Sequence, residues 1–69
     1  MNNRERLIDV ITRYNLDRIE ISEMLKVKRE TVDHWLLPPE SSKHEEVPEM
    51  AIELLEIKLK IRGQNRDSE

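Results

Sequence analysis

Few residues of this 69-residue chain are suited to covalent chemistry, and they do not form the pattern of an enzyme. The chain has no cysteine and a single glycine, so it offers neither a thiol nucleophile nor a glycine-rich phosphate loop. Its two histidines, His34 and His44, have no Cys, Asp or His partners at the spacing of metal ligands. No nucleophile is paired with a base. We therefore expect no enzyme activity, no metal, no cofactor and no small-molecule effector.

The chemistry that remains is electrostatic, and the charge is uneven along the chain. The net charge of −3 has the wrong sign for a general polyanion binder. Residues 1–29 contain seven Lys or Arg and five Asp or Glu, a balance of +2, whereas residues 30–69 contain five and ten, a balance of −5. A basic surface formed by the first half is thus compatible with phosphate binding, while the acidic half points elsewhere.

The length of the chain predicts one small domain with little stability to spare, since a chain of this size buries only about 60% of the surface that it exposes when unfolded. Without cysteines, disulfides are excluded, and self-association is the remaining way to add stability. No apolar run approaches the roughly 18 residues of a membrane span. Residues 1–6 lack the apolar stretch of a signal peptide. We expect a cytoplasmic protein with no membrane contact.

Apolar spacing and capping residues predict an all-α fold of four helices. Asn2 with Glu5, and Asp17 with Glu20, resemble capping boxes that begin the first two helices. On the first helix, arginines such as Arg4 fall on the solvent side. The expected ends are Asn15 for the first helix, Lys26 for the second, and Leu37, before Pro38 and Pro39, for the third, which starts at about Arg29.

The fourth predicted helix is the longest and follows an exposed loop over residues 38–46. It opens at Pro48, because proline suits the first helical position, and Gly63 supplies its stop. Lys58, Lys60 and Arg62 favour its negative end. This divides the chain into a domain over residues 1–63 and a polar C-terminal tail over residues 64–69.

The second and third helices are joined by too few residues for an ordinary helical hairpin. A short helix, a tight turn with one buried aliphatic residue and a second helix form the helix-turn-helix arrangement. Ile21 and Leu25, Val27 in the turn, then Val32 and Trp35 would form its small core. Trp35 falls on this apolar stripe, which favours a core role over stacking on bases. The outer face of the third helix is then free to enter a major groove.

Residues 16–35, LDRIEISEMLKVKRETVDHW, resemble the helix-turn-helix of the Cro/cI-type repressors of phages and bacteria. The continuation, with WLLPP at 35–39, SSK at 41–43 and VPEMAIELL at 47–55, is similar in layout to the anti-CRISPR-associated autorepressors. The resemblance covers about residues 5–62. It implies a sequence-specific repressor or autoregulator of phage or prophage type, which binds a palindromic operator as a homodimer and blocks RNA polymerase.

The chain departs from this family at two positions of the turn. Lys26 stands where glycine is common and a positive φ is expected, at a cost of about 1 kcal/mol. Lys28 stands where Ser or Thr usually caps the recognition helix. Both departures place positive charge where a phosphate would lie.

The resemblance also implies a role for individual residues. Arg29 would bind a guanine edge and Glu30 a cytosine amine, whereas the negative charge of Asp33 is harder to reconcile with DNA. His44 would touch the backbone together with its neighbours in the loop. The implied base contacts are Arg29, Glu30, Thr31, Asp33 and His34, and the implied phosphate contacts are Arg18, Lys26, Lys28, Ser42 and Lys43.

Other interpretations of these charges stay open. Glu30 and Asp33 are also typical of a solvated acidic face, in which case the third helix is a protein-docking surface, as in an antirepressor or a host-takeover protein. Lys28 and Arg29 are also compatible with plain surface charge. An accessory DNA protein without sequence preference is a further alternative, against which the lack of strong basic charge argues.

The fourth helix carries two apolar rows, and two rows on one helix need two partners. The rest of the domain can cover one row, and a second subunit is the natural cover for the other. We therefore expect a homodimer with its axis near this helix and its recognition helices about 34 Å apart. The alternative is a helix buried wholly within one subunit. The expected interface residues are Met50, Ile52, Leu55, Ile57, Leu59 and Ile61, and Leu54 belongs to the same row as Met50, Ile57 and Ile61.

Overall fold

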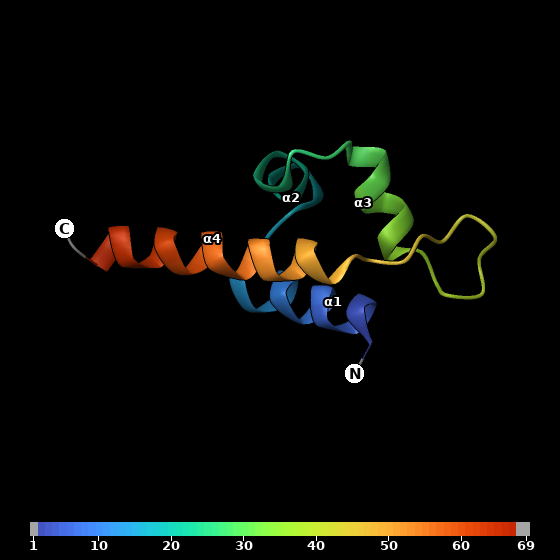
Figure 1. The fold of residues 1–69 in the computed structure, drawn as a ribbon, viewed down its shortest axis with the longest axis horizontal. Coiled ribbons are helices and arrows are strands. Elements are labelled where there is room, and N and C mark those ends of the chain that lie inside the picture. The colour runs from blue at the N-terminus through green and yellow to red at the C-terminus, as the bar shows by residue number, and fades with distance from the viewer. Residues whose placement is uncertain (1, 68–69) are drawn as a thin grey trace.

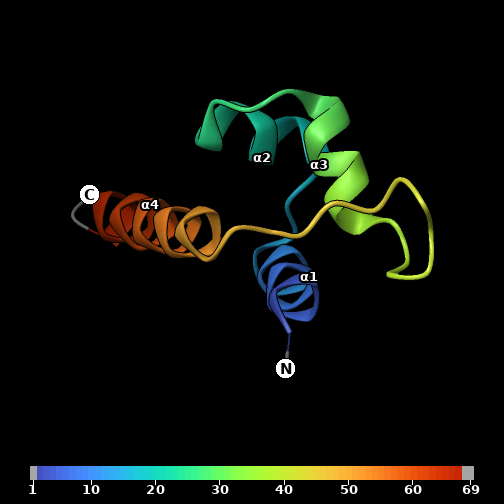
Figure 2. The ribbon, with the colours of Figure 1, turned by 45° about the vertical axis from the view of Figure 1, so that its right-hand side comes forward.

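A computed structural model describes residues 2–67, and the side chains of residues 2–62. These residues form four helices and no strand, so the expected all-helical fold is confirmed. The long α4 lies against both α1 and α2, and α3 follows α2 in a different direction (Figures 1 and 2). The helices are α1 (Asn3–Tyr14), α2 (Arg18–Leu25), α3 (Arg29–Leu36) and α4 (Glu49–Asp67).

The first two helices begin as their sequences predict. The side chain of Asn2 accepts a hydrogen bond from the Glu5 N–H at 2.8 Å. Asp17 accepts one from the Glu20 N–H at 2.8 Å. Each carboxamide or carboxylate thus satisfies one of the N–H groups that a helix leaves open at its start. At the other end of α1, Asn15 adopts the left-handed conformation with φ 53°, as expected.

One hydrophobic core joins the four helices. Trp35 of α3 is only 4% exposed, which confirms its core role, and Val32 beside it is fully buried. Leu16, between α1 and α2, and Val47, just before α4, close the core at its edges. Among residues 2–62, the buried apolar residues are Leu7, Val10, Leu16, Ile21, Leu25, Val32, Trp35, Val47, Ile52, Leu55 and Leu59.

The two apolar rows of α4 have different surroundings. Ile52, Leu55 and Leu59 are at most 2% exposed, because α1 and α2 cover them. Their assignment to a subunit interface is therefore wrong, since this fold leaves them no surface to offer a partner. The other row stays exposed and consists of Met50, Leu54, Ile57 and Ile61.

Both ends of α4 differ slightly from the sequence prediction. The helix begins one residue after Pro48, whose carbonyl accepts hydrogen bonds from the N–H groups of Ala51 and Ile52. The expected stop at Gly63 is wrong, because α4 continues to Asp67. A glycine inside a helix costs about 1 kcal/mol, which good helix formers before it can offset. The polar tail predicted over residues 64–69 falls on this last part of α4 and on Ser68 and Glu69, which lie outside the described residues.

Two cations from the long helices close the C-terminal ends of the two short ones. The Arg4 guanidinium of α1 donates to the carbonyls of Leu36 at 3.1 Å and Leu37 at 3.0 Å, at the end of α3. The Lys58 ammonium of α4 donates to the Met24 carbonyl of α2 at 2.6 Å. These carbonyls lack helical partners, and positive charge is favourable at this end of a helix. Arg4 is half-buried here and does not lie on the solvent side, as its position in α1 had suggested.

We predict that Arg4→Met lowers the free energy of unfolding by about 2 kcal/mol, because two charge-assisted hydrogen bonds to partly buried carbonyls are lost. The control is Arg13→Met on the same helix, since among residues 2–62 Arg13 pairs only with the exposed Asp9. That variant should change stability by less than about 0.5 kcal/mol. Urea unfolding followed by the fluorescence of Trp35, the only tryptophan, measures both. Equal losses in the two variants would contradict this role of Arg4.

Candidate nucleic-acid interface

Three residues, Lys26 to Lys28, connect α2 to α3 in a tight turn. Lys26 has φ 59° and ψ 41°, so the positive φ expected at this position is confirmed. The carbonyl of Ser22 accepts hydrogen bonds from the N–H groups of both Lys26 and Val27, which closes the end of α2. Val27 packs against the core, as expected for the aliphatic residue of the turn. The turn thus fixes where α3 begins.

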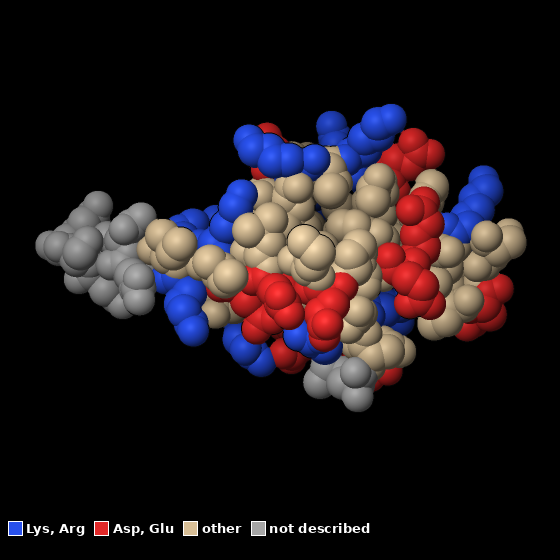
Figure 3. Space-filling model, viewed as in Figure 1, with Lys and Arg blue, Asp and Glu red and all other residues tan. Residues whose placement is uncertain are grey.

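The start of α3 is positively charged and open. Lys26, Lys28 and Arg29 are all exposed, and Lys and Arg side chains gather at the top of the molecule, where α2 and α3 meet (Figure 3). No side chain of the described residues caps α3, and its first backbone bonds run from the N–H groups of Thr31 and Val32 to the Lys28 carbonyl. The N–H groups at the very start of the helix are therefore available to an anion.

The two sides of α3 differ in burial. Val32 and Trp35 face the core, whereas Arg29 and Glu30 are exposed. The remaining predicted base contacts, Thr31, Asp33 and His34, are half-buried. The helix therefore presents its first turn to solvent more fully than its last.

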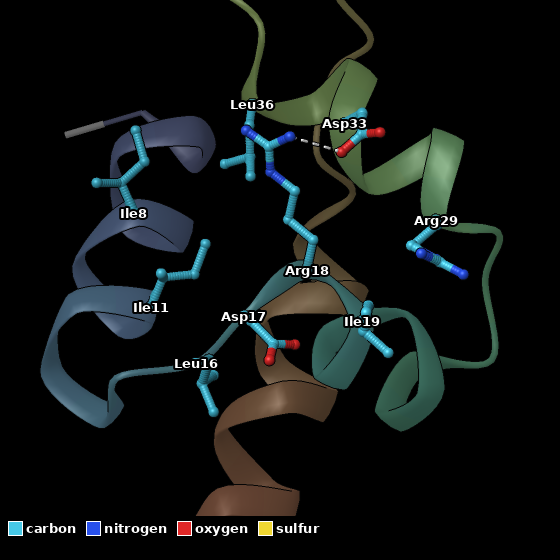
Figure 4. Close-up of a pocket in the computed structure, with 9 residues that line it drawn as sticks. All are labelled: Ile8, Ile11, Leu16, Asp17, Arg18, Ile19, Arg29, Asp33 and Leu36. Carbon is cyan, nitrogen blue, oxygen red and sulfur yellow. Dashed lines mark hydrogen bonds and ion pairs between the residues drawn. The ribbon is translucent and has the colours of Figure 1, made fainter.

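Arg18 and Asp33, which were predicted to contact DNA separately, contact each other. The Arg18 Nη1 and Asp33 Oδ1 atoms are 3.0 Å apart, and both side chains are about half exposed. In Figure 4 the guanidinium of Arg18 points to Asp33, while Arg29 points away from both. The pair compensates the charge of Asp33, and an exposed ion pair of this kind contributes at most about 1 kcal/mol, so it can open for another ligand.

His34 holds the loop that follows α3. Its Nδ1 lies 2.7 Å from Oε2 of Glu45, and its carbonyl accepts a hydrogen bond from the Glu45 N–H at 3.1 Å. Its Nε2 lies 3.8 Å from a carboxylate oxygen of Glu30. Sequence reasoning missed this role, because the ten residues between His34 and Glu45 carry no signal that brings the two side chains together.

The loop residues lie at the other end of α3 from the turn. Ser42 and Lys43 are exposed, as is needed for any phosphate contact. Local hydrogen bonds shape the loop, from the Ser41 N–H to the Pro38 carbonyl and from the His44 N–H to the Ser41 carbonyl. The predicted phosphate contacts therefore form two groups, one at each end of α3, and Arg18 lies apart from both.

A groove with a volume of about 770 Å³ runs between α1 and the α2–α3 pair (Figure 4). Ile8 and Ile11 line it from α1, and Ile19 lines it from α2. Ile8 is 37% exposed and Ile19 is 47% exposed, so this part of the surface is apolar. Arg18, Arg29 and Asp33 also line the groove. No sequence pattern had indicated this groove.

Comparison with models of protein families, with curated proteins and with solved structures gives no match for this chain. Within residues 2–67, no helix combines the length and apolar character that crossing a bilayer requires. In the same part of the chain, no three His, Asp or Glu side chains converge as metal ligands.

We predict that Lys26→Gly raises the free energy of unfolding by about 0.5–1 kcal/mol, because glycine adopts a positive φ without the steric cost that a Cβ imposes. The control is Asn15→Gly, since Asn15 has a similar φ of 53° but asparagine tolerates this conformation better. Its gain should be smaller. Urea unfolding measures both variants. A neutral or destabilising Lys26→Gly would show that the turn does not hold a positive φ at residue 26.

Proposed function

We propose that the chain is a sequence-specific DNA-binding repressor or autoregulator of phage or prophage type, in which α2, the turn and α3 act as a helix-turn-helix. One observation carries the proposal. The start of α3 exposes Arg29 beside Lys26 and Lys28, while Val32 and Trp35 hold the opposite side of the helix in the core. The resemblance of residues 16–35 to the Cro/cI-type repressors supports the same function.

In this proposal the N-terminal turn of α3 enters the major groove. Arg29 binds O6 and N7 of a guanine, because its planar fork matches these two acceptors. Lys26 and Lys28 bind phosphates, together with the open N–H groups at the start of α3. Glu30 accepts a hydrogen bond from a cytosine amine, which gives the acidic residue a place beside DNA.

The Arg18–Asp33 pair reduces the electrostatic objection that Asp33 raises to this docking. A free carboxylate at Asp33 would repel phosphates, but the guanidinium of Arg18 lies 3.0 Å from it. The acidic residues of the second half of the chain include Glu49, Glu53 and Glu56 of α4, away from the start of α3. Figure 3 shows blue side chains at the top of the molecule, over α2 and the start of α3, and red ones below the first part of α4 and along the right-hand side of α3. The basic top is the end with which a chain of negative net charge would approach DNA.

A homodimer on a palindromic operator completes the proposal. A two-fold dimer presents two copies of α3, and such dimers bind half-sites about one helical turn of DNA apart. Occupation of the operator would block RNA polymerase. The exposed apolar row of α4 supports association of two chains, since it is the surface of α4 that the core leaves uncovered.

A protein-interaction module, such as an antirepressor or a host-takeover protein, is the second candidate. The groove between α1 and the α2–α3 pair favours it, because exposed Ile8 and Ile19 offer an apolar surface beside Arg18. The two functions differ in their response to DNA sequence. The regulator prefers one operator, whereas the interaction module binds all duplexes with similarly low affinity.

We predict that the chain enriches one sequence from a pool of random duplexes, and that Arg29→Ala weakens binding to it by about 1–3 kcal/mol and relaxes the choice of one base. Lys28→Ala should instead weaken binding to all duplexes and lower the slope of log affinity against log salt by about 1. Fluorescence anisotropy of labelled duplexes at several salt concentrations measures both effects.

The matched control is Arg13→Ala, because Arg13 lies at the far end of α1 and pairs with Asp9. Its affinity for the selected duplex should equal that of the unchanged chain. If the pool yields no preferred sequence, or if Arg29→Ala and Arg13→Ala bind alike, the proposed function is rejected.

A further inference from the structure

Two apolar rows run along nearly opposite faces of α4, and only one of them is covered. The covered row, Ile52, Leu55 and Leu59, lies in the core. In the uncovered row the exposed fractions are 80% for Met50, 40% for Leu54, 56% for Ile57 and 51% for Ile61. A helix advances about 100° per residue, which places the centres of the two rows on opposite sides of the axis. Figure 3 shows uncharged surface along α4, with acidic side chains beside it.

The spacing of the uncovered row indicates what kind of partner fits it. Its members follow one another at intervals of four, three and four residues, which is the spacing of the apolar seam between two packed helices. In such a pair the residues flanking the seam decide which partner is accepted and in which direction it runs. A partner for α4 is thus a helix with a similar row and matching flanking charges.

One flank of the row carries two unengaged charges of opposite sign. Glu53 and Lys60 are exposed, and within the described residues neither forms an ion pair or a side-chain hydrogen bond. They lie seven residues apart, on the same side of the helix. The other flank consists of Ala51 and Lys58, and Lys58 is already bound to the Met24 carbonyl of α2. Glu53 and Lys60 are therefore a complementary pair of charges that no side chain of residues 2–62 engages.

We propose that the uncovered row of α4 binds the same row of a second copy of this chain, with the two helices antiparallel. In the register that covers all four residues, Met50 packs on Ile61 of the partner subunit and Leu54 on Ile57 of the partner subunit. Glu53 then faces Lys60 of the partner subunit, and the two-fold axis repeats this ion pair. Shifting either helix by one heptad would leave part of the row uncovered.

The charges also decide between the two directions. A parallel pair would place Glu53 beside Lys58 of the partner subunit, whose ammonium is engaged with α2, and would leave Lys60 without a counter-charge. In the antiparallel pair, Glu53 and Lys60 of each subunit both gain a counter-charge, so two ion pairs form. The inference rests on the proposed homodimer and specifies its contact, and its tests are made without DNA.

The first test is the mass of the chain in solution. Sedimentation equilibrium at micromolar concentration should give twice the 8.3 kDa of one chain. Ile57→Asp should give the single chain, since it places a charge in the middle of the seam. The matched control is Ile19→Asp, which changes an isoleucine of similar exposure on α2 and should leave the dimer intact. A single chain at all concentrations, or equal loss in both variants, overturns the contact.

The second test exchanges the charges. Lys60→Glu and Glu53→Lys should each raise the dissociation constant of the dimer about tenfold, because two ion pairs become two repulsions. The double variant should return it close to its original value. Glu46→Lys, an equal change outside α4, should have no effect. Lack of recovery in the double variant overturns the pairing of Glu53 with Lys60.

The third test measures direction directly. Since the chain has no cysteine, Leu54→Cys and Ile57→Cys each introduce the only thiol. On oxidation of a mixture, the antiparallel seam should yield mainly the disulfide between the two variants, and dimers of one variant alone would overturn it. A single chain that still selects one DNA sequence rejects this contact and the homodimer, and leaves the proposed binding of DNA by α3. A dimer of this geometry without sequence preference supports the contact and rejects the proposed function.

Discussion

Cations from the long helices close the C-terminal ends of the short helices α2 and α3, and the arrangement of the molecule depends on these contacts. Each short helix has eight residues, a length at which an isolated helix is not stable in water. Lys58 binds the Met24 carbonyl at the end of α2, and Arg4 binds two carbonyls at the end of α3. Because Pro38 and Pro39 end α3, the Leu36 and Leu37 carbonyls receive no helical N–H from residues 40 and 41, and Arg4 supplies the donors instead. The direction of α3 relative to α1 is fixed in this way.

Because Arg4 anchors the last turn of α3, the first turn of this helix can remain exposed to solvent. Val32 and Trp35 hold one side in the core, and the turn at Lys26 sets the point where the helix starts. The open N–H groups and exposed cations leave the start of α3 positively charged, while His34 and the loop secure the other end. The uncovered row of α4 belongs to a different helix, so the proposed association of two chains and the proposed binding of DNA use different residues.

The sequence predicted what depends on neighbours along the chain and missed what depends on distant contacts. The caps at Asn2 and Asp17 and the positive φ at Lys26 are local features, and the structure confirms them. The inner face of α3 follows from its spacing. The roles of Arg4 and His34 and the Arg18–Asp33 pair required the tertiary arrangement, because their partners lie 11 to 33 residues away. In α4 both rows are equally apolar, so spacing alone could not tell the buried row from the exposed one, and Ile52, Leu55 and Leu59 were assigned to an interface that they cannot reach.

The central claim is that the solvent side of the start of α3 binds DNA. Its most direct test is the amide spectrum of the ¹⁵N-labelled chain titrated with a duplex recovered by selection from a random pool. The claim predicts that the amide signals of residues 26–31 shift most, that those of residues 42–43 shift less, and that those of α1 stay in place. Shifts centred on Ile8 and Ile19 in the groove, or no duplex recovered by the selection, would contradict it.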